Sequence, residues 1–319
     1  MSSKKPERRR HYEHAVFDSA RWDGFDSRAD DITVCTSYKA GTTWTQTICA
    51  LLIFQQPELA APLSQLSPWL DMVLKPVDEV HSALAAQRHR RIIKTHTPLD
   101  GLPWSDDPAY VFCGRDPRDV FMSMLNHLDN TDEEVMRRLR SEAGLDAPET
   151  DMPELPSDPN ILFRVWLEVG SFEWEQDGFP FWSHFSHANS FWEHRHLPNL
   201  YFLHYADLQA DLDGEMRRLS EFLGIDVDES RWPSLVQAAT FDAVKARPEQ
   251  FAPEADIGIW KDNAKFFNKG TSGQWRGALS AESLALYEKV KAERMSAQLG
   301  DWLERGSAAC GDTPKNLPD

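Results

Sequence analysis

Short runs of apolar and β-branched residues alternate along the chain with longer segments in which apolar residues recur at helical spacing. Such short runs are typical of strands buried on both faces. They predict strands at Ile32–Cys35, Arg91–Thr95, Tyr110–Cys113 and Leu200–Leu203. The helical pattern, punctuated by proline and glycine, predicts helices at Trp44–Gln56, Pro76–Gln87, Pro117–Leu128, Ala206–Leu223 and Ala281–Leu303. This alternation predicts an α/β fold with a mostly parallel central sheet flanked by helices.

One segment interrupts the alternation. Residues 129–160 are acidic and rich in proline, with a weak helical pattern only at Glu133–Glu142. Such a composition is typical of a disordered surface loop, whereas a long connection beside a site can also act as a lid. We find no internal repeat. We therefore expect an N-terminal tail and lead-in at residues 1–29, one domain at residues 30–305 and a C-terminal tail at residues 306–319.

Charge and composition narrow the function. The 319 residues include 34 Lys and Arg against 51 Asp and Glu, a net charge of −17. Such a chain is a poor candidate for binding nucleic acid, although basic groups focused at one point can still bind an anion. The basic N-terminus is not followed by an apolar stretch, and the longest apolar run, Ile48–Phe54, is too short to span a membrane. We expect a cytoplasmic protein whose four scattered cysteines are reduced.

The segment between the first predicted strand and the first predicted helix suits a phosphate. Its sequence, from Thr36, is TSYKAGTTW. A helix N-terminus offers unpaired N–H groups and a partial positive charge, and Gly41 lets the backbone approach an anion closely. Thr42 and Thr43 can donate through their hydroxyls, and Lys39 adds a positive charge. An ordinary turn capped by threonine would contain the same residues. The segment is not a Walker A motif, because its lysine precedes the glycine.

Two further segments carry groups suited to an anion. Arg115 follows the third predicted strand, at the end where open α/β sheets bind ligands, and Ser123 follows within the next predicted helix. Both could contact a phosphate, whereas an ion pair between Arg115 and Asp119 is an equally good reading. Near the C-terminus, Lys269 stands beside a glycine and predicts a third anion-binding turn, a weak signal by itself.

His96 ends the second predicted strand, within the sequence KTHTP. Histidine is the side chain best suited to proton abstraction near neutral pH. A single histidine is more often structural than catalytic, but His96 lies at the same sheet edge as the phosphate segment. Five later histidines do not fall at the spacing of zinc ligands and are expected at surface or packing positions; they are His184, His187, His194, His196 and His204.

Six segments, in order from about Asp30 to about Leu279, resemble the cytosolic-type sulfotransferases that use 3′-phosphoadenosine 5′-phosphosulfate (PAPS). The family's 5′-phosphosulfate loop is similar to SYKAGTTW, its catalytic histidine segment to KTHTPLD, and its 3′-phosphate motif to GRDPRDVFMS. The segments beside the adenine are similar to LPNLYFLHYADL and ATFDAVK, and the closing phosphate segment to FFNKGTSGQW. The bacterial glycolipid branch of the family is most like the runs SPWLD and KTHTPLDGLP.

This resemblance implies a P-loop-like sulfotransferase fold and an enzyme that moves the sulfuryl group of PAPS to a hydroxyl. The acceptor would be a small molecule, a lipid or a glycolipid. The nucleotide product would be adenosine 3′,5′-bisphosphate (PAP), and no metal would take part. His96 would be the general base, with Lys39, Lys94 and Ser123 as the other catalytic residues. The implied donor-binding residues are Lys39, Ala40, Gly41, Thr42, Thr43, Trp44, Arg115, Ser123, Tyr205, Thr240, Phe241, Phe267, Asn268, Lys269 and Gly270. Candidates for an apolar acceptor pocket, for which core positions are at least as good an explanation, are Trp69, Phe179, Phe181 and Trp182.

The chain departs from the family's pattern at several positions. Tyr38 stands where proline is usual and Ala40 where serine is usual, and Asn268 replaces a common arginine. A neutral contact is weaker than a charge-assisted one, so binding of the 3′-phosphate is expected to be weaker. The dimer motif of animal members is not recognisable at Leu279–Glu288, which leaves the oligomeric state open.

Two other functions remain as alternatives. A P-loop kinase acting on a small molecule would need ATP and Mg²⁺, but the chain contains no Gly-Lys dipeptide. A non-catalytic protein that binds PAPS or PAP would not need a base, but His96 is present.

Overall fold

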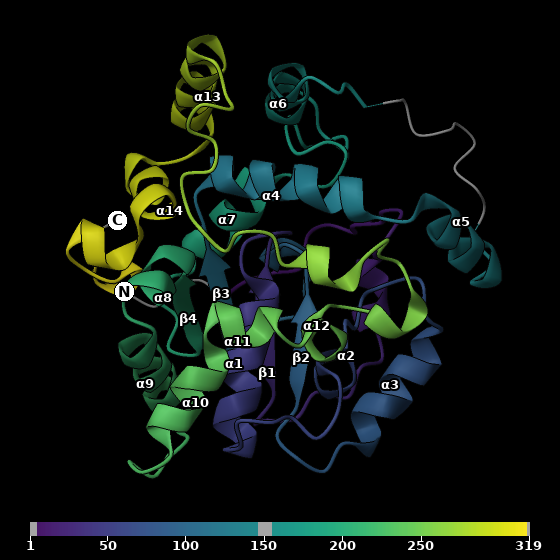
Figure 1. Cartoon of the computed structure of the whole chain (residues 1–319), viewed down its shortest axis with the longest axis vertical. Coiled ribbons are helices and arrows are strands. Elements are labelled where there is room, and N and C mark those ends of the chain that lie inside the picture. Colours follow the sequence, from purple (N-terminus) through teal and green to yellow (C-terminus); the bar gives the residue numbers. More distant parts are fainter. Residues whose placement is uncertain (1–4, 146–154, 318–319) are drawn as a thin grey trace.

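Four parallel strands form the centre of the structure, and their carboxyl ends point toward α4 (Pro117–Asn130) (Figure 1). The computed structural model describes residues 5–145 and 155–317. Within these ranges the strand order is β2-β1-β3-β4, with every neighbouring pair parallel. The strands are β1 (Ile32–Thr36), β2 (Ile92–Thr95), β3 (Ala109–Gly114) and β4 (Leu200–His204). The α/β class and all four predicted strands are therefore confirmed.

The burial of the strands explains why the sequence predicted them well. Every residue of β1, β2 and β3 is buried, whereas the edge strand β4 leaves Tyr201 and Phe202 partly exposed. Successive side chains of a strand point to opposite faces. Accordingly, Ile32 and Val34 join one apolar cluster and Cys35 joins the other. Helices must therefore cover both faces of the sheet.

The two apolar clusters identify which helices cover each face. One cluster contains side chains of α1, α9 and α10, and the other contains side chains of α4, α6, α7, α13 and α14. Of the other helices, α2, α8, α11 and α12 add side chains to the first cluster, and α3 adds side chains to the second. Besides α4, the α-helices in the described part of the chain are α1 (Thr42–Phe54), α2 (Leu63–Leu66), α3 (Val77–Ala86), α5 (Glu133–Glu142), α6 (Pro159–Glu168), α7 (His184–Trp192), α8 (Tyr205–Ala210), α9 (Leu212–Leu223), α10 (Trp232–Ala239), α11 (Phe241–Lys245), α12 (Pro248–Phe251), α13 (Ala281–Arg294) and α14 (Ala297–Cys310).

Two predicted helices are each divided in the structure. The helix predicted at Ala206–Leu223 is wrong as one unit, because the non-helical backbone of Asp211 separates α8 from α9. The Asp211 side chain caps α9 by accepting from the N–H of Gly214. The helix predicted at Ala281–Leu303 likewise ends at Met295, and the hydroxyl of Ser296 begins α14 by accepting from the backbone. In both places a side chain that caps the start of the second helix lies at the division.

The segment predicted as a loop or lid is described only in part. The weak helical pattern at Glu133–Glu142 forms α5, which Asp132 caps through the N–H groups of Glu134 and Val135. Residues 146–154 lie outside the described residues, so the lid stays a prediction. All four cysteines are free thiols. In the described ranges, we find no helix with both the length and the apolar character that crossing a bilayer requires.

Candidate active site

The carboxyl ends of all four strands border one cavity of about 1590 Å³. Lys39 and Gly41 follow β1, Lys94 lies in β2, Arg115 follows β3 and Tyr205 follows β4, and all five line the cavity. Open α/β sheets bind their ligands at this edge, because the loops that follow neighbouring strands converge there. The topology therefore gathers residues that are far apart in the sequence.

The loop between β1 and α1 leaves the start of the helix open to the cavity. Gly41 precedes the helix with a left-handed φ of 111°, and no side chain caps the helix N-terminus. A Cβ atom at this position would lie 3.1 Å from Sγ of Cys113 and 3.2 Å from the ring of Tyr205, so glycine is needed. Thr42 and Thr43 in the first turn line the cavity. The arrangement suits an anion at the helix N-terminus.

Lys39 lies within this loop and lines the cavity. Its backbone has a left-handed φ of 57°. Its Nζ atom lies 3.4 Å from Nδ1 of His127 and 4.1 Å from the ring centre of Phe266. Burial lowers the pKa of the Lys39 ammonium to about 7, and the charges of Arg115 and Lys94 contribute. A positive charge in this setting is destabilised until an anion arrives.

His96 follows β2 with its ring against two aromatic side chains. Its Nδ1 atom lies 2.7 Å from the carbonyl oxygen of Thr36, and its ring packs on Trp69 and Trp182 at centroid distances of 4.8 and 5.6 Å. A carbonyl only accepts, so Nδ1 carries the hydrogen and Nε2 presents a lone pair. Burial and the charge of Lys94 hold the pKa of His96 well below its usual value. The imidazole is therefore a neutral base near pH 7.

Lys94 brings a second buried ammonium to the same wall. Its Nζ atom lies 4.0 Å from the ring centre of Trp69. Burial lowers the pKa of Lys94 to about 8, while the charges of Glu254 and Asp71 oppose this shift. The ammonium is therefore held close to the base, over an aromatic ring that partly compensates for lost solvation.

Asp71 fixes this wall from behind. Its carboxylate is fully buried and accepts hydrogen bonds from Trp22 Nε1, Trp69 Nε1, Thr95 Oγ1 and Thr97 Oγ1. Burial raises the pKa of Asp71, and these donors oppose the shift. A buried carboxylate with several donors holds each of them in one orientation. The indole of Trp69 and the end of β2 are therefore fixed beside His96.

Arg115 is a buried guanidinium that keeps unused donor capacity. Its Nη1 donates to the carbonyl of Lys39 at 2.8 Å, and its guanidinium stacks 4.2 Å above the ring centre of Tyr205. Its Nε atom has no hydrogen-bond partner among the described residues. The alternative ion pair with Asp119 does not form, because that carboxylate instead accepts from the N–H groups of Gly273 and Gln274 at 2.7 and 2.9 Å. A buried cation with a free donor suits an anionic ligand.

The closing segment is held against the cavity by side chains from other elements. Besides the bonds to Asp119, its Asn268 carbonyl accepts from Nζ of Lys245 at 2.6 Å. Gly270 has a left-handed φ of 65°, and a Cβ atom there would lie 2.6 Å from the ring of Phe241. Phe267, Asn268 and Gly270 line the cavity. The segment therefore approaches Phe241 as closely as glycine allows.

The comparisons with known proteins identify the family. The sequence profile described as "Sulfotransferase domain" matches residues 29–298. The chain belongs to the sulfotransferase family. A glycolipid sulfotransferase of Mycobacterium bovis is 41% identical over 293 residues, which span 88% of this chain and 89% of the relative. Human sulfotransferase 1C2 is 25% identical over 285 residues, which span 85% of each chain. The family predicted from the motifs is thus confirmed.

The fold of this sulfotransferase agrees with solved structures. The crystal structure of mouse sulfotransferase SULT7A1 complexed with PAP matches with a TM-score of 0.64 at 20% identity, covering 89% of this chain and 92% of that chain. The structure of retinol dehydratase in complex with androsterone and PAP matches with a TM-score of 0.65 at 23% identity, covering 88% of this chain and 84% of that chain. At such identities the likeness shows the fold, which is the P-loop-like sulfotransferase fold predicted.

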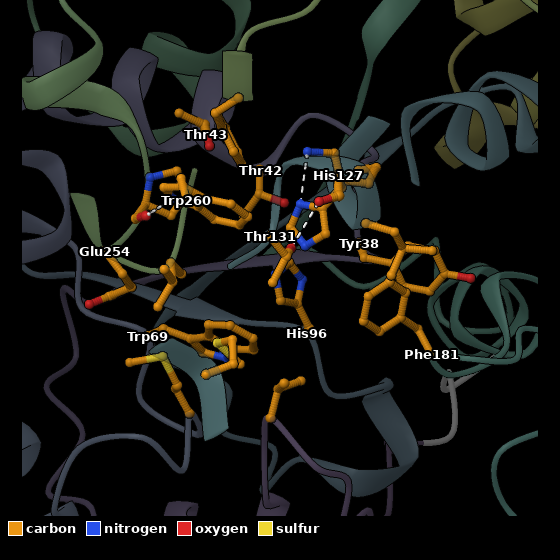
Figure 2. A pocket seen from close by; sticks show the side chains of 18 of the residues that line it. Tyr38, Thr42, Thr43, Trp69, His96, His127, Thr131, Phe181, Glu254 and Trp260 are labelled. Atoms are coloured by element: carbon orange, nitrogen blue, oxygen red, sulfur yellow. Dashed lines mark hydrogen bonds between the residues drawn. The ribbon is translucent and has the colours of Figure 1, made fainter. Parts of the chain in front are cut away.

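Most of the predicted site residues of this sulfotransferase line the one cavity, as Figure 2 shows in part. Four do not: Ala40 is fully buried beneath the loop, Thr240 caps α11, Lys269 is exposed, and Phe179 lies outside the lining. The predicted residues that line the cavity are Lys39, Gly41, Thr42, Thr43, Trp44, Trp69, Lys94, His96, Arg115, Ser123, Phe181, Trp182, Tyr205, Phe241, Phe267, Asn268 and Gly270.

Sequence reasoning missed several side chains of this cavity, among them His127, Trp260 and Phe266. His127 had a usable signal, because it lies four residues after Ser123 and so on the same face of α4. Trp260 lies outside the helices and strands, and Phe266 ends the one-turn 3₁₀ helix Asn263–Phe266, so periodicity gives no orientation for either.

Proposed function

We propose that this sulfotransferase moves the sulfuryl group of PAPS to a hydroxyl of a lipid or glycolipid acceptor. One observation carries the proposal: three basic groups, Lys39, Lys94 and Arg115, share a cavity with the neutral base His96, and both Lys94 and Arg115 are buried. Basic groups gathered in one cavity of a strongly acidic chain mark a site for an anion. A base among them marks the place of a proton transfer.

The donor side of the cavity fits a nucleotide with two phosphate groups. The open N-terminus of α1 would hold the 5′-phosphosulfate, and the unpartnered donor of Arg115 would hold the 3′-phosphate with Ser123. The rings of Trp44, Tyr205 and Phe241 line the same region and would pack on the adenine. The solved sulfotransferase that contains PAP supports this choice of donor.

The acceptor side is largely apolar. Figure 2 shows His96 between Trp69 on one side and Phe181 on the other, and Trp182 packs on the imidazole as well. Apolar walls with one polar group at the base suit an acceptor with an apolar body and one reacting hydroxyl. The mycobacterial relative is named a glycolipid sulfotransferase, which supports a lipid-linked acceptor. The large volume of the cavity is consistent with such a molecule.

The chemistry assigned to the residues follows from their charges. Nε2 of His96 takes the proton of the acceptor hydroxyl as its oxygen bonds to sulfur. Lys39 neutralises the charge that grows on the phosphate oxygen as the bond from that oxygen to sulfur breaks. Lys94 holds a sulfonate oxygen or the acceptor beside the base. Positioning and neutralisation carry such a transfer, as in phosphoryl transfer, and we expect turnover to survive EDTA.

Calorimetric titration with PAP, in EDTA and with ATP as the control, tests the donor assignment. Micromolar or tighter binding of PAP, with much weaker binding of ATP, would support it. Absence of PAP binding would overturn it, and a kinase assay with ATP and Mg²⁺ would then test the kinase alternative. A screen of phenols, sterols and glycolipids with PAPS would follow, and transfer to none of them would favour the non-catalytic alternative.

A further inference from the structure

The side chain of Lys39 is held by groups outside its own loop. Its Nζ atom contacts Nδ1 of His127, which belongs to α4, and lies over the ring of Phe266. Phe266 is the last residue of the 3₁₀ helix Asn263–Phe266. The backbone of Lys39 is fixed separately, because its carbonyl accepts from Arg115. Among the described residues, no hydrogen bond joins Lys39 to Ser123, which lies on the same face of α4 as His127. Lys39 can therefore leave His127 by side-chain rotations alone.

The imidazole of His127 is oriented by the rings around it. Its centroid lies 4.8 Å from that of Trp260, 5.9 Å from that of Phe181 and 6.3 Å from that of Phe266. The three contacts are edge-to-face. Figure 2 shows His127 above His96, with the dashed contact reaching its ring. Such packing leaves the ring little freedom, so Nδ1 stays directed at the Lys39 side chain.

The charge state of His127 makes it an acceptor. An ammonium has only donors, so Nδ1 must present its lone pair and Nε2 must carry the hydrogen. Burial, together with the charges of Lys39 and Lys94, holds the pKa of His127 well below its usual value. The ring is therefore neutral near pH 7 and can accept from Lys39 without repelling it.

We propose that His127 is a positioning residue that holds the Lys39 amine away from the donor site until an anionic donor draws it back. The inference rests on the function proposed above, in which Lys39 neutralises the leaving phosphate. Donor binding must then break the contact between Lys39 and His127. Breaking the contact between Lys39 and His127 costs free energy that offsets part of the attraction between Lys39 and the donor. The contact therefore weakens the affinity for the nucleotide.

The test is the affinity for PAP, measured by calorimetry on the full chain with substitutions at His127. In His127→Phe the ring volume is kept and the acceptor is lost, so PAP should bind about twofold to tenfold more tightly, the range of one net hydrogen bond. In His127→Asn, Oδ1 can replace Nδ1 as acceptor, so the affinity should stay within about twofold of wild type. His127→Leu serves as a second variant without an acceptor if the phenylalanine variant does not fold.

Lys39 provides the control, because the effect must act through its amine. In a Lys39→Ala background, His127→Phe should leave the affinity for PAP unchanged, which a double-mutant cycle measures. Weaker or unchanged PAP binding in both His127→Phe and His127→Leu would overturn the inference, since a purely structural role predicts a loss. Tighter binding that persists without the Lys39 amine would overturn it too. If the wild-type protein does not bind PAP, the proposed function is wrong, and the inference that rests on it is wrong as well.

Discussion

Nδ1 of His96 lies 2.7 Å from the carbonyl oxygen of Thr36, the last residue of β1. The strand that leads into the candidate phosphate loop therefore also sets the tautomer of the candidate base. One backbone carbonyl thus joins the candidate base to the strand before the candidate phosphate loop. The imidazole ring also packs on Trp69 and Trp182.

We expect His96→Asn to lose turnover while it keeps the donor site. The asparagine amide can still donate to Thr36, but it has no group that accepts a proton near neutral pH. General base catalysis contributes about 10²–10⁴-fold, and turnover should fall by about that factor. The affinity for PAP, measured by calorimetry, should remain close to that of wild type. Turnover near the wild-type rate in this variant would contradict the assignment of the base.

The pH dependence of kcat/KM for the donor should show activity retained on the acid side and lost on the basic side. The pKa of His96 lies well below its usual value, so the base stays deprotonated as the pH falls through 6.5. The pKa of Lys39 is lowered to about 7, so its charge is lost as the pH rises through that value. Lys39→Arg keeps a charge at higher pH and should move the basic limb upward. An unmoved basic limb would mean that another group titrates there.

Arg115→Lys should weaken PAP binding by about tenfold to a hundredfold, the range of a charge-assisted hydrogen bond. Lysine keeps the charge but loses the paired N–H donors of the guanidinium and its planar stacking on Tyr205. Arg164→Lys is the matched control, because Arg164 is exposed on α6 and pairs with Glu282. Calorimetry on both variants checks the prediction, and equal affinities would contradict it.

Phe181→Ala should raise KM for a lipid-linked acceptor and leave the affinity for PAP nearly unchanged. The ring of Phe181 lines the cavity against Tyr38 at a centroid distance of 4.9 Å, on the acceptor side of His96. Removing it takes away apolar contact area from the acceptor, while Trp260 and Phe266 still pack on His127 and keep its contact with Lys39. Steady-state kinetics with the best acceptor of the screen, beside PAP calorimetry, separates the two effects. A loss of PAP affinity as large as the rise in KM would place Phe181 at the donor instead.

The sequence predicted the strands and several polar residues of the cavity, because these depend on the local order of residues along the chain. Each strand is a short apolar run, and Lys39, His96 and Arg115 each follow or end one of them, so parallel topology alone brings them to one edge. The division at Asp211 was not predicted, because an aspartate within a helical pattern reads equally as a surface position or as a cap.

The packing partners of the site could not be predicted in the same way. His127 lies on a predicted helix, but its contact with Lys39 depends on where α4 crosses the sheet. Trp260 and the short 3₁₀ helix that ends at Phe266 are positioned by tertiary contacts, among them the two hydrogen bonds between Asn130 and Asp262. Contacts between segments distant in sequence need the three-dimensional structure.

Glu175 predicts a dependence of stability on pH that is separate from the active site. The side chain is buried, and this burial, together with the charge of Asp177, raises the pKa of Glu175 to about 8. An unfolded glutamate releases its proton near pH 4.3, so between the two values the folded state holds the extra proton. Stability contributed by this group is thus lost as the pH rises.

Glutamine resembles the protonated acid and removes this dependence. The melting temperature of Glu175→Gln should therefore exceed that of wild type by a margin that grows from pH 5 to pH 8. Glu173→Gln, at an exposed neighbouring position, is the control, and a margin that stays constant with pH would show that Glu175 does not titrate in this range.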